Sequence, residues 1–195
     1  MKFFRITFLF LVGITLLISC KKTGCTDPDA LNYQESASKD DHSCYYFWIG
    51  QHHEGGDIFY IDKTRKHGLI TATFNLQKGH SASGSGYVST STDVYRGVDN
   101  TELIAKTFGP GTAAYDCYML DTLGYNDWFL PSREEVVGMA KSLGKLGQAN
   151  TFGMAYILTS SYSDSSNIWT VYMPSLTAIS MDGATKGFVR PMRIF

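Results

Sequence analysis

The alternation of apolar and polar residues predicts short strands and short helices after residue 46. Apolar runs between polar or glycine-rich turns indicate strands at 57–62, 68–74, 155–160, 167–173, 178–181 and 187–194. Apolar residues at three-to-four spacing indicate helices at 100–107 and 112–120, and a third after Pro131. The Ser-, Thr- and Gly-rich stretch 75–100 has no period and is expected to be a long surface loop. We expect the last four strands to form one antiparallel sheet that closes an α+β domain.

The stretch YNDWFLPSREE, residues 125–135, is expected to start the third helix. Pro131 has no N–H and pre-sets φ for a helix start, while Ser132 and Glu135 stand three apart as a capping box. Behind the cap, apolar residues recur every three to four positions, at Val136, Val137, Ala140 and Leu143. One face of this helix must therefore be covered, and we expect the aromatic block that starts at Trp128 to cover it.

Two of the closing strands carry residues with expected structural roles. In IWTVYM, alternation places Trp169, Val171 and Met173 on one face of the strand and the other three residues on the opposite face. One of the two faces is expected to be core. Arg190 and Arg193 stand three apart in the last strand, so they should point to opposite faces and not form one binding patch. Either arginine is expected to pair with a carboxylate such as Asp127 or Glu135.

The N-terminus has the order of a secretory signal, because Lys2 and Arg5 precede an apolar run at 6–18. This run is shorter than the roughly 20 residues that a helix needs to cross a bilayer. It ends in LISC, which resembles the bacterial lipobox. The resemblance implies that residues 1–19 are removed and that Cys20 is acylated, as in a lipoprotein anchored in the bacterial envelope, most simply in the outer membrane. The alternative is an ordinary signal peptide with an incidental cysteine.

Charge sets one limit on the partners. The whole chain carries 17 basic and 18 acidic residues, and the loss of residues 1–19 takes two basic residues away, which leaves 15 against 18, a net charge of −3. A chain with this balance presents no general surface for polyanions, so no nucleic-acid partner is expected. Its length suits one domain with a small appendage.

After a linker at 20–24, Cys25 and Cys44 bound an acidic segment that resembles a short motif recurrent in secreted proteins of Bacteroidota. Export favours a disulfide between the two cysteines, and closing a loop of about 20 residues stabilises it by about 3 kcal/mol. Carboxylates are the ligands that calcium prefers, so one hypothesis is a calcium site. Its ligands would be Asp27, Asp29, Asp40 and Asp41. The other hypothesis is a solvated, disulfide-stapled spacer without metal.

Six separated stretches in the remaining chain occur in a characteristic order. They are IGQHHEGGDIFYID at 49–62, HGLI at 67–70, NTELI at 100–104, TAAYDC at 112–117, GYNDWFLPSREEV at 124–136 and FVRPMRIF at 188–195. Together they resemble the Lcl C-terminal domain family, named for a collagen-like bacterial adhesin, over residues 47–195. The resemblance implies a C-type-lectin-like fold with short antiparallel strands and two to three helices. It also implies a binding module on a secreted or surface protein.

The sequence offers few candidates for chemistry. His52 and His53 are adjacent on an expected strand and should point to opposite faces, so a zinc site shared with Glu54 and His67 would need unusual backbone geometry. Cys117 is expected to be a small buried residue on a helix face and not a nucleophile. No set of nucleophile, base and orienting group is recognisable, so we predict no catalytic residue.

The residues favour a non-catalytic binding module, for glycan or surface-protein ligands, in adhesion or nutrient capture. Aromatic residues beside short polar loops suit sugar binding, but they do not assign a ligand or its binding residues. Two alternatives stay open at this point. One is an envelope enzyme whose site is assembled from residues distant in sequence, and the other is a structural envelope subunit without a ligand. No cofactor other than calcium is expected, and the oligomeric state is left open.

Overall fold

The structure of the chain, a computed structural model, describes residues 21–76, 81–82, 86–147 and 155–195. In these ranges the helices are α1 (Gly97–Phe108), α2 (Ala113–Tyr118) and α3 (Arg133–Gly144). One antiparallel sheet has the order β3 (His52–His53), β4 (Gly56–Ile61), β5 (Gly68–Ala72) and β9 (Met192–Ile194). The second consists of β6 (Tyr156–Tyr162), β7 (Asn167–Tyr172) and β8 (Thr177–Asp182). The predicted mixture of helices and antiparallel sheets is confirmed.

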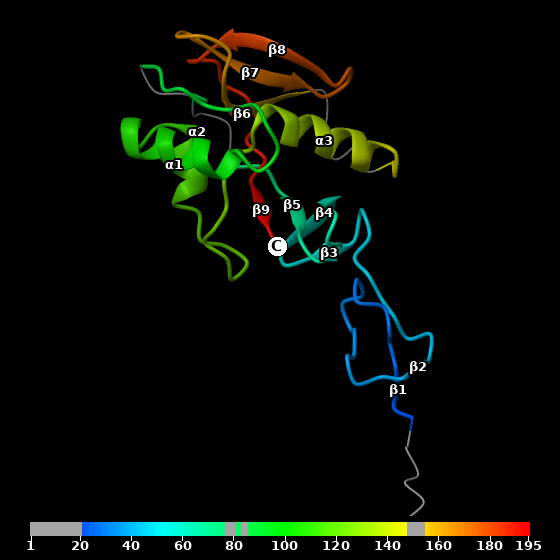
Figure 1. Cartoon of the computed structure of the whole chain (residues 1–195). Coiled ribbons are helices and arrows are strands. Elements are labelled where there is room, and N and C mark those ends of the chain that lie inside the picture. The colour runs from blue at the N-terminus through cyan, green and yellow to red at the C-terminus, as the bar shows by residue number, and fades with distance from the viewer. Residues whose placement is uncertain (1–20, 77–80, 83–85, 148–154) are drawn as a thin grey trace, which may run out of the picture.

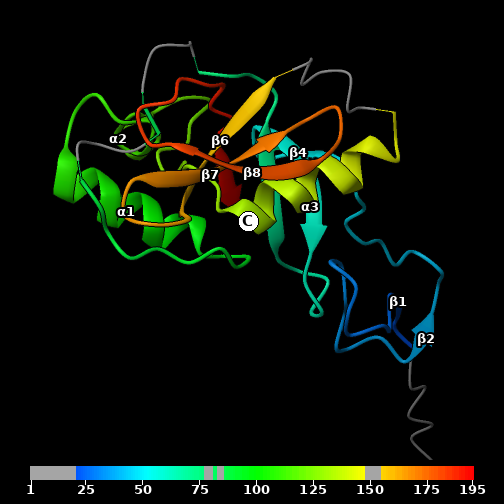
Figure 2. The same cartoon turned by 90° about the horizontal axis from the view of Figure 1, so that it is seen from above.

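Helix α3 lies between the two sheets and contacts both of them (Figures 1 and 2). Its apolar side chains enter a first core, to which β4, β5, β6, β7 and β9 each contribute. A second core lies on the other face of β6 and β7, where α1 and α2 pack. The strands β6 and β7 therefore have a buried face on each side, because Ile157 and Val171 belong to the first core while Leu158 and Ile168 belong to the second. The Trp169 strand thus has the predicted core face and, in addition, a buried residue on the opposite face.

The segment Trp128–Ser132 joins these parts. Phe129 enters the first core and Leu130 the second, so two consecutive residues serve both. Because the segment is extended, its backbone groups bond to neighbouring elements rather than to each other. Phe129 exchanges two backbone hydrogen bonds with Met192 of β9, at 2.9 and 3.0 Å. Leu130 is bonded through both its N–H and its carbonyl to the Thr101 hydroxyl of α1, at 2.9 and 3.0 Å. Each layer of the domain is thus attached to this one stretch.

Helix α3 begins as its sequence predicts. Ser132 is the N-cap and accepts a hydrogen bond from the Glu135 N–H, while the Glu135 carboxylate accepts one from the Ser132 N–H at 2.7 Å. Both side chains are fully buried. Burial raises the pKa of Glu135, although hydrogen bonds from the backbone of Ser132, Gly97 and Tyr95 act in the opposite direction.

Helix α1 begins at Gly97, three residues before the predicted start at Asn100. No side chain of its own flanking sequence caps it, and the Glu135 carboxylate of α3 lies 3.4 Å from the Gly97 N–H. A Cβ at Gly97 would stand 2.3 Å from that carboxylate and 2.6 Å from the Phe129 ring, so only glycine fits. The Asn100 side chain, expected at the helix boundary, is buried and bonds to Ser91 instead.

The last strand is shorter than predicted and belongs to the other sheet. Of the expected strand at 187–194, only Met192–Ile194 forms a strand, and it pairs with β5 rather than with β6, β7 or β8. Before it, Phe188 makes a single parallel bridge with Ile157 of β6. Pro191 separates the two pairings because it has no N–H to donate to a ladder. The chain therefore crosses from one sheet to the other, and the predicted four-stranded closing sheet was wrong.

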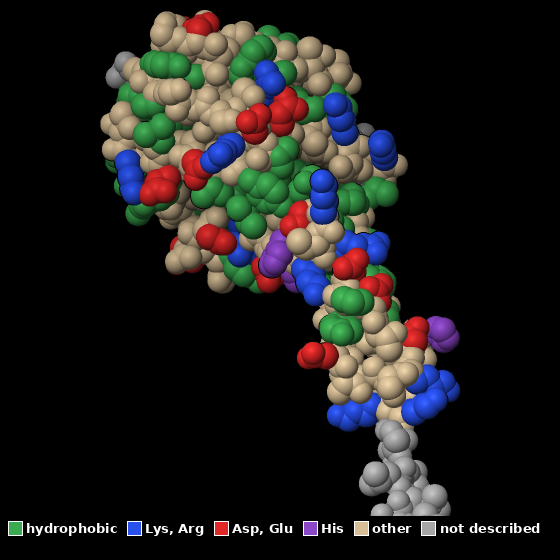
Figure 3. All heavy atoms as spheres, viewed as in Figure 1, with side chains coloured by type: hydrophobic (Ala, Val, Ile, Leu, Met, Phe, Trp, Pro, Cys, Tyr) green, Lys and Arg blue, Asp and Glu red, His purple; other side chains and the backbone are tan. Residues whose placement is uncertain are grey.

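The N-terminal segment forms a narrow extension next to the domain (Figures 1 and 3). Its disulfide between Cys25 and Cys44 is present, which confirms that prediction. Two short parallel strands, β1 (Thr23–Gly24) and β2 (Lys39–Asp40), add backbone pairing to the loop. The segment is tied to the chain that follows it, since the Tyr46 hydroxyl donates to Asp27.

Thiol counting tests the disulfide. The chain from Lys21 to Phe195 contains three cysteines, and Cys117 is the free one within the described residues. Denatured without reductant, it should therefore yield one reactive thiol, and the native protein should yield none because Cys117 is fully buried. Three thiols in the denatured sample, or a disulfide-linked peptide that contains Cys117, would contradict the stapled segment.

Within the described residues, none of the helices combines the length and the hydropathy that a bilayer span requires.

Candidate functional site

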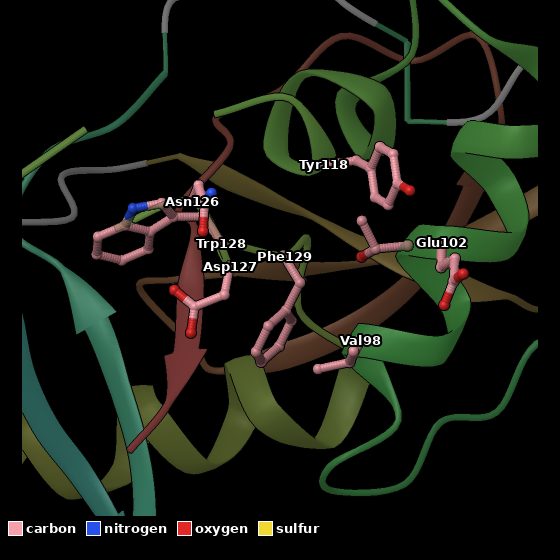
Figure 4. Close-up of a pocket in the computed structure, with 8 residues that line it drawn as sticks. Val98, Glu102, Tyr118, Asn126, Asp127, Trp128 and Phe129 are labelled. Carbon is pink, nitrogen blue, oxygen red and sulfur yellow. The ribbon is translucent and has the colours of Figure 1, made fainter. Parts of the chain in front are cut away.

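A pocket of about 340 Å³ lies between α1, the end of α2 and the start of the Trp128 segment (Figure 4). We call it the α1–α2 pocket. Its lining residues are Val98, Thr101, Glu102, Tyr118, Asn126, Asp127, Trp128 and Phe129. Three separate stretches of sequence contribute to it, so it exists only when the domain is folded.

Helix α1 supplies the acidic side of the pocket. Its buried face carries Thr101 and Ile104 toward the core, which leaves Glu102 on the outside of the helix. Lys106 follows one turn later and donates to the Glu102 carboxylate, an exposed pair at a spacing typical of helices. The Glu102 side chain nevertheless stays half exposed, at 50%.

Helix α2 supplies the aromatic side. Thr112 caps this helix by accepting a hydrogen bond from the Tyr115 N–H at 3.1 Å, and Ala113, Ala114 and Cys117 face the core. Tyr118, the next residue after Cys117, points outward and is 41% exposed. Figure 4 shows its ring on the same side of the pocket as Glu102.

Trp128 is a core residue and contributes little to the pocket surface. Its side chain is 2% exposed and packs edge-on against Phe74, with ring centroids 6.0 Å apart. Its indole N–H donates to the Thr122 carbonyl at 3.4 Å. In Figure 4 the ring points away from Tyr118 and Glu102. Phe129 is buried to the same extent, at 2%, so Tyr118 is the pocket-lining ring that is exposed to a molecule in the pocket.

Arg193 of β9 holds Asp127 in place. The guanidinium bonds both carboxylate oxygens of Asp127, one of them at 3.0 Å, and donates to the Glu54 carbonyl at 2.9 Å. It also stacks on Tyr125, 3.6 Å from the ring centroid. The Arg193 side chain is 6% exposed whereas Asp127 is 52% exposed. The buried guanidinium therefore holds the Asp127 carboxylate in a fixed position at the edge of the pocket. The predicted pairing of an arginine with Asp127 is present.

Arg190 has a different environment. It is buried and donates to the Ala72 carbonyl at 2.7 Å. Burial lowers its pKa to about 10, partly offset by the charge of Asp57. The two arginines do not share a binding surface. Trp169 is the other aromatic residue considered in the sequence analysis. The Arg133 guanidinium lies over it, 4.9 Å from the centroid of the Trp169 ring.

A second hollow, of about 430 Å³, lies beside the last turn of α3. Two lysines and mainly apolar groups line it. The lining residues are Ala140, Lys141, Gly144, Lys145, Met173, Pro174 and Leu176. Lysines near a helix C-terminus are favoured by the helix dipole alone. The α1–α2 pocket is the better candidate because it combines carboxylates, an amide and an aromatic ring.

The candidate metal ligands do not come together. In the described part of the chain, no group of three or more His, Cys, Asp or Glu side chains is placed to hold a metal ion. Asp27, Asp40 and Asp41 instead accept hydrogen bonds from nearby backbone N–H groups. The geometry thus gives the calcium hypothesis for Asp27, Asp29, Asp40 and Asp41 no support.

Of the residues considered for a zinc site, His53 contacts Glu54 at 3.6 Å, while the other two histidines have different partners. His52 contacts Asp57 at 3.0 Å, and His67 contacts the Phe195 carbonyl at 3.3 Å. Cys117 is fully buried, and this burial raises the pKa of its thiol, so the thiolate that a nucleophile needs is disfavoured.

No protein-family model matches the chain, and no curated protein matches it.

Sequence reasoning did not single out Glu102, Tyr118 or Asn126. The sequence nevertheless pointed toward them, because they lie in or next to three of the six stretches that carry the family resemblance. Glu102 lies in NTELI, Tyr118 directly follows TAAYDC, and Asn126 lies in GYNDWFLPSREEV. What the sequence lacked was the fold that brings these three stretches to one place.

Proposed function

We propose that the chain is a non-catalytic lipoprotein of the bacterial envelope whose domain, residues 47–195, binds a glycan or protein ligand. The observation that carries this proposal is the α1–α2 pocket. Its edge presents half-exposed carboxylates and an exposed aromatic ring, while the residues directly beneath it are fully buried. A concave site with a few fixed polar groups on a rigid base is the usual form of a ligand site.

The resemblance to the Lcl C-terminal domain supports the same function. Such domains look related to the C-type-lectin-like fold and tend to act as binding modules on surface proteins. The order of mixed short strands and helices is compatible with that fold, and the residues that line the pocket lie in or next to three of the stretches that carry the resemblance.

Anchoring in the membrane is proposed from the LISC sequence at Cys20. We expect Cys20→Ser to move the protein from the membrane fraction to the soluble fraction, since a single change removes the acylation site. Each buried methylene contributes about 0.8 kcal/mol and stable anchoring needs more than one chain, so loss of the acyl groups should be decisive. Cell fractionation and uptake of labelled fatty acid measure it. Membrane association of Cys20→Ser, together with no label on the wild type, would exclude the lipoprotein.

A glycan array tests the binding function. The acyl-free chain from Lys21 to Phe195 is applied with calcium and with chelator, beside a variant that carries Glu102→Gln and Tyr118→Ala. Binding of a defined glycan by the wild type, and its loss in the variant, would support a carbohydrate ligand at the α1–α2 pocket. Equal binding with calcium and chelator is expected, because the described acidic residues form no group of three that could hold the ion. If the variant still bound the glycan, the binding site would lie outside the α1–α2 pocket.

A further inference from the structure

We infer that the α1–α2 pocket receives an arginine side chain from a partner protein. This inference rests on the proposed binding function and names the ligand class of the same site. It is drawn from the carboxylates of the pocket, the placement of its aromatic ring and two exposed apolar residues that follow lining residues in the chain.

The charge of the pocket favours a cation. Two carboxylates line it, Glu102 and Asp127, and no basic side chain does. The stretch from Gly97 to Asp127, which builds the pocket, carries five acidic residues and one basic residue, Lys106, and Arg193 of β9 adds a second cation at Asp127. Asp127 is turned toward Arg193 and Glu102 toward Lys106, yet both carboxylates stay half exposed and keep lone pairs for a further donor.

The ring beside the carboxylates favours a planar cation. A guanidinium stacks on an aromatic face and at the same time donates in its plane to carboxylates. Arg193 shows this combination within the same domain, where it stacks on Tyr125 while it bonds Asp127. Tyr118 and Glu102, whose carboxylate already accepts from Lys106, offer an incoming guanidinium the same two kinds of contact (Figure 4).

The surroundings favour a polypeptide as the carrier of that cation. Leu103 and Met119 directly follow Glu102 and Tyr118 in the chain, and they are 42% and 59% exposed. Neither side chain lines the pocket itself. Exposed apolar side chains close to a polar anchor site are common in protein interfaces. A free sugar would leave these two side chains uncovered. A peptide with apolar residues on both sides of an arginine would cover them.

A pair of tripeptides tests the inference. N-acetyl-Leu-Arg-Leu-amide carries the arginine, and its partner carries citrulline, which has the same shape without the charge. Each is titrated into the isotope-labelled chain from Lys21 to Phe195 while the backbone amide resonances are followed. We expect the arginine peptide to shift the amides of Glu102, Tyr118 and Asn126, and to bind about tenfold more tightly than the citrulline peptide, because a charged hydrogen bond is stronger by about that factor.

Two variants locate the effect. Glu102→Gln should reduce the affinity for the arginine peptide to about that for the citrulline peptide. Asp99→Asn removes the same charge from the same helix but from a residue outside the pocket lining, so it should change the affinity less than about twofold at 0.15 M salt. Equal affinities of the two peptides, or shifts confined to other parts of the domain, would overturn the inference. If a glycan bound at the pocket and the arginine peptide did not, the inference would fail while the proposed binding function stood.

Discussion

Replacing Trp128 by alanine should lower the free energy of unfolding by about 3 to 5 kcal/mol, the cost of removing a large buried ring. This is a large part of the 5 to 15 kcal/mol that typically stabilises a domain. The ring is 2% exposed, packs against Phe74 and lies beneath the Arg193 guanidinium, 5.5 Å from the ring centroid. Its removal therefore opens a cavity next to the segment that serves both cores. Urea unfolding of wild type and variant measures the change.

Ser132→Ala is the matched comparison, because Ser132 is equally buried and lies four residues further along the same segment. Its hydroxyl accepts from the Glu135 N–H and donates to the Asp93 carbonyl at 2.8 Å, so its loss should cost about 1 to 2 kcal/mol. The larger effect of Trp128→Ala is the diagnostic result. An unchanged melting temperature for that variant would mean that the ring is an exposed platform.

Replacing Glu135 by alanine should destabilise the domain by about 2 to 4 kcal/mol. The carboxylate accepts from the Ser132 N–H of α3 and lies next to the Gly97 N–H of α1, so both helix starts lose a buried acceptor at once. A buried donor left without an acceptor costs about 1 to 3 kcal/mol. The raised pKa of the buried carboxyl reflects a desolvation cost, which offsets part of this loss. Urea unfolding gives the total, and hydrogen exchange of the Gly97 amide reports on α1.

Glu134→Ala is the control for this prediction, since it removes the same side chain one position earlier on the same helix. Glu134 is partly exposed and pairs only with the neighbouring Arg133 among its described contacts, so the change should stay within about 0.5 kcal/mol. Equal effects of the two variants, or unchanged exchange at Gly97 in Glu135→Ala, would show that the carboxylate does not join the helices.

The parts of the fold that follow from neighbouring residues could be predicted. The cap of α3 depends on Ser132 and Glu135, which are three residues apart. The spacing of the apolar residues that follow predicts the apolar face of the helix. The second role of Glu135 could not be seen, because its other partner, Gly97, is 38 residues away. Helix α1 therefore began earlier than the local pattern indicated.

The end of the chain shows the same limit. Its apolar pattern predicted a strand, but a pattern does not say which sheet a strand joins, and Pro191 divides the stretch between two partners. Of the candidate site, the sequence marked Asp127 as a partner for an arginine and Trp128 as a core residue. It could not bring Glu102 and Tyr118 together, because they lie on different helices and nothing local distinguishes them from other exposed side chains.

The central claim is that the domain binds its ligand at the α1–α2 pocket, above a core that includes Trp128. Tyr118→Ala tests it most directly when its melting temperature and its binding are measured on one preparation. Tyr118 is 41% exposed, so the account predicts a melt close to that of the wild type, together with at least about a tenfold loss in affinity for the glycan or the arginine peptide that the wild type binds. A variant that melts like the wild type and binds as tightly would contradict the claim.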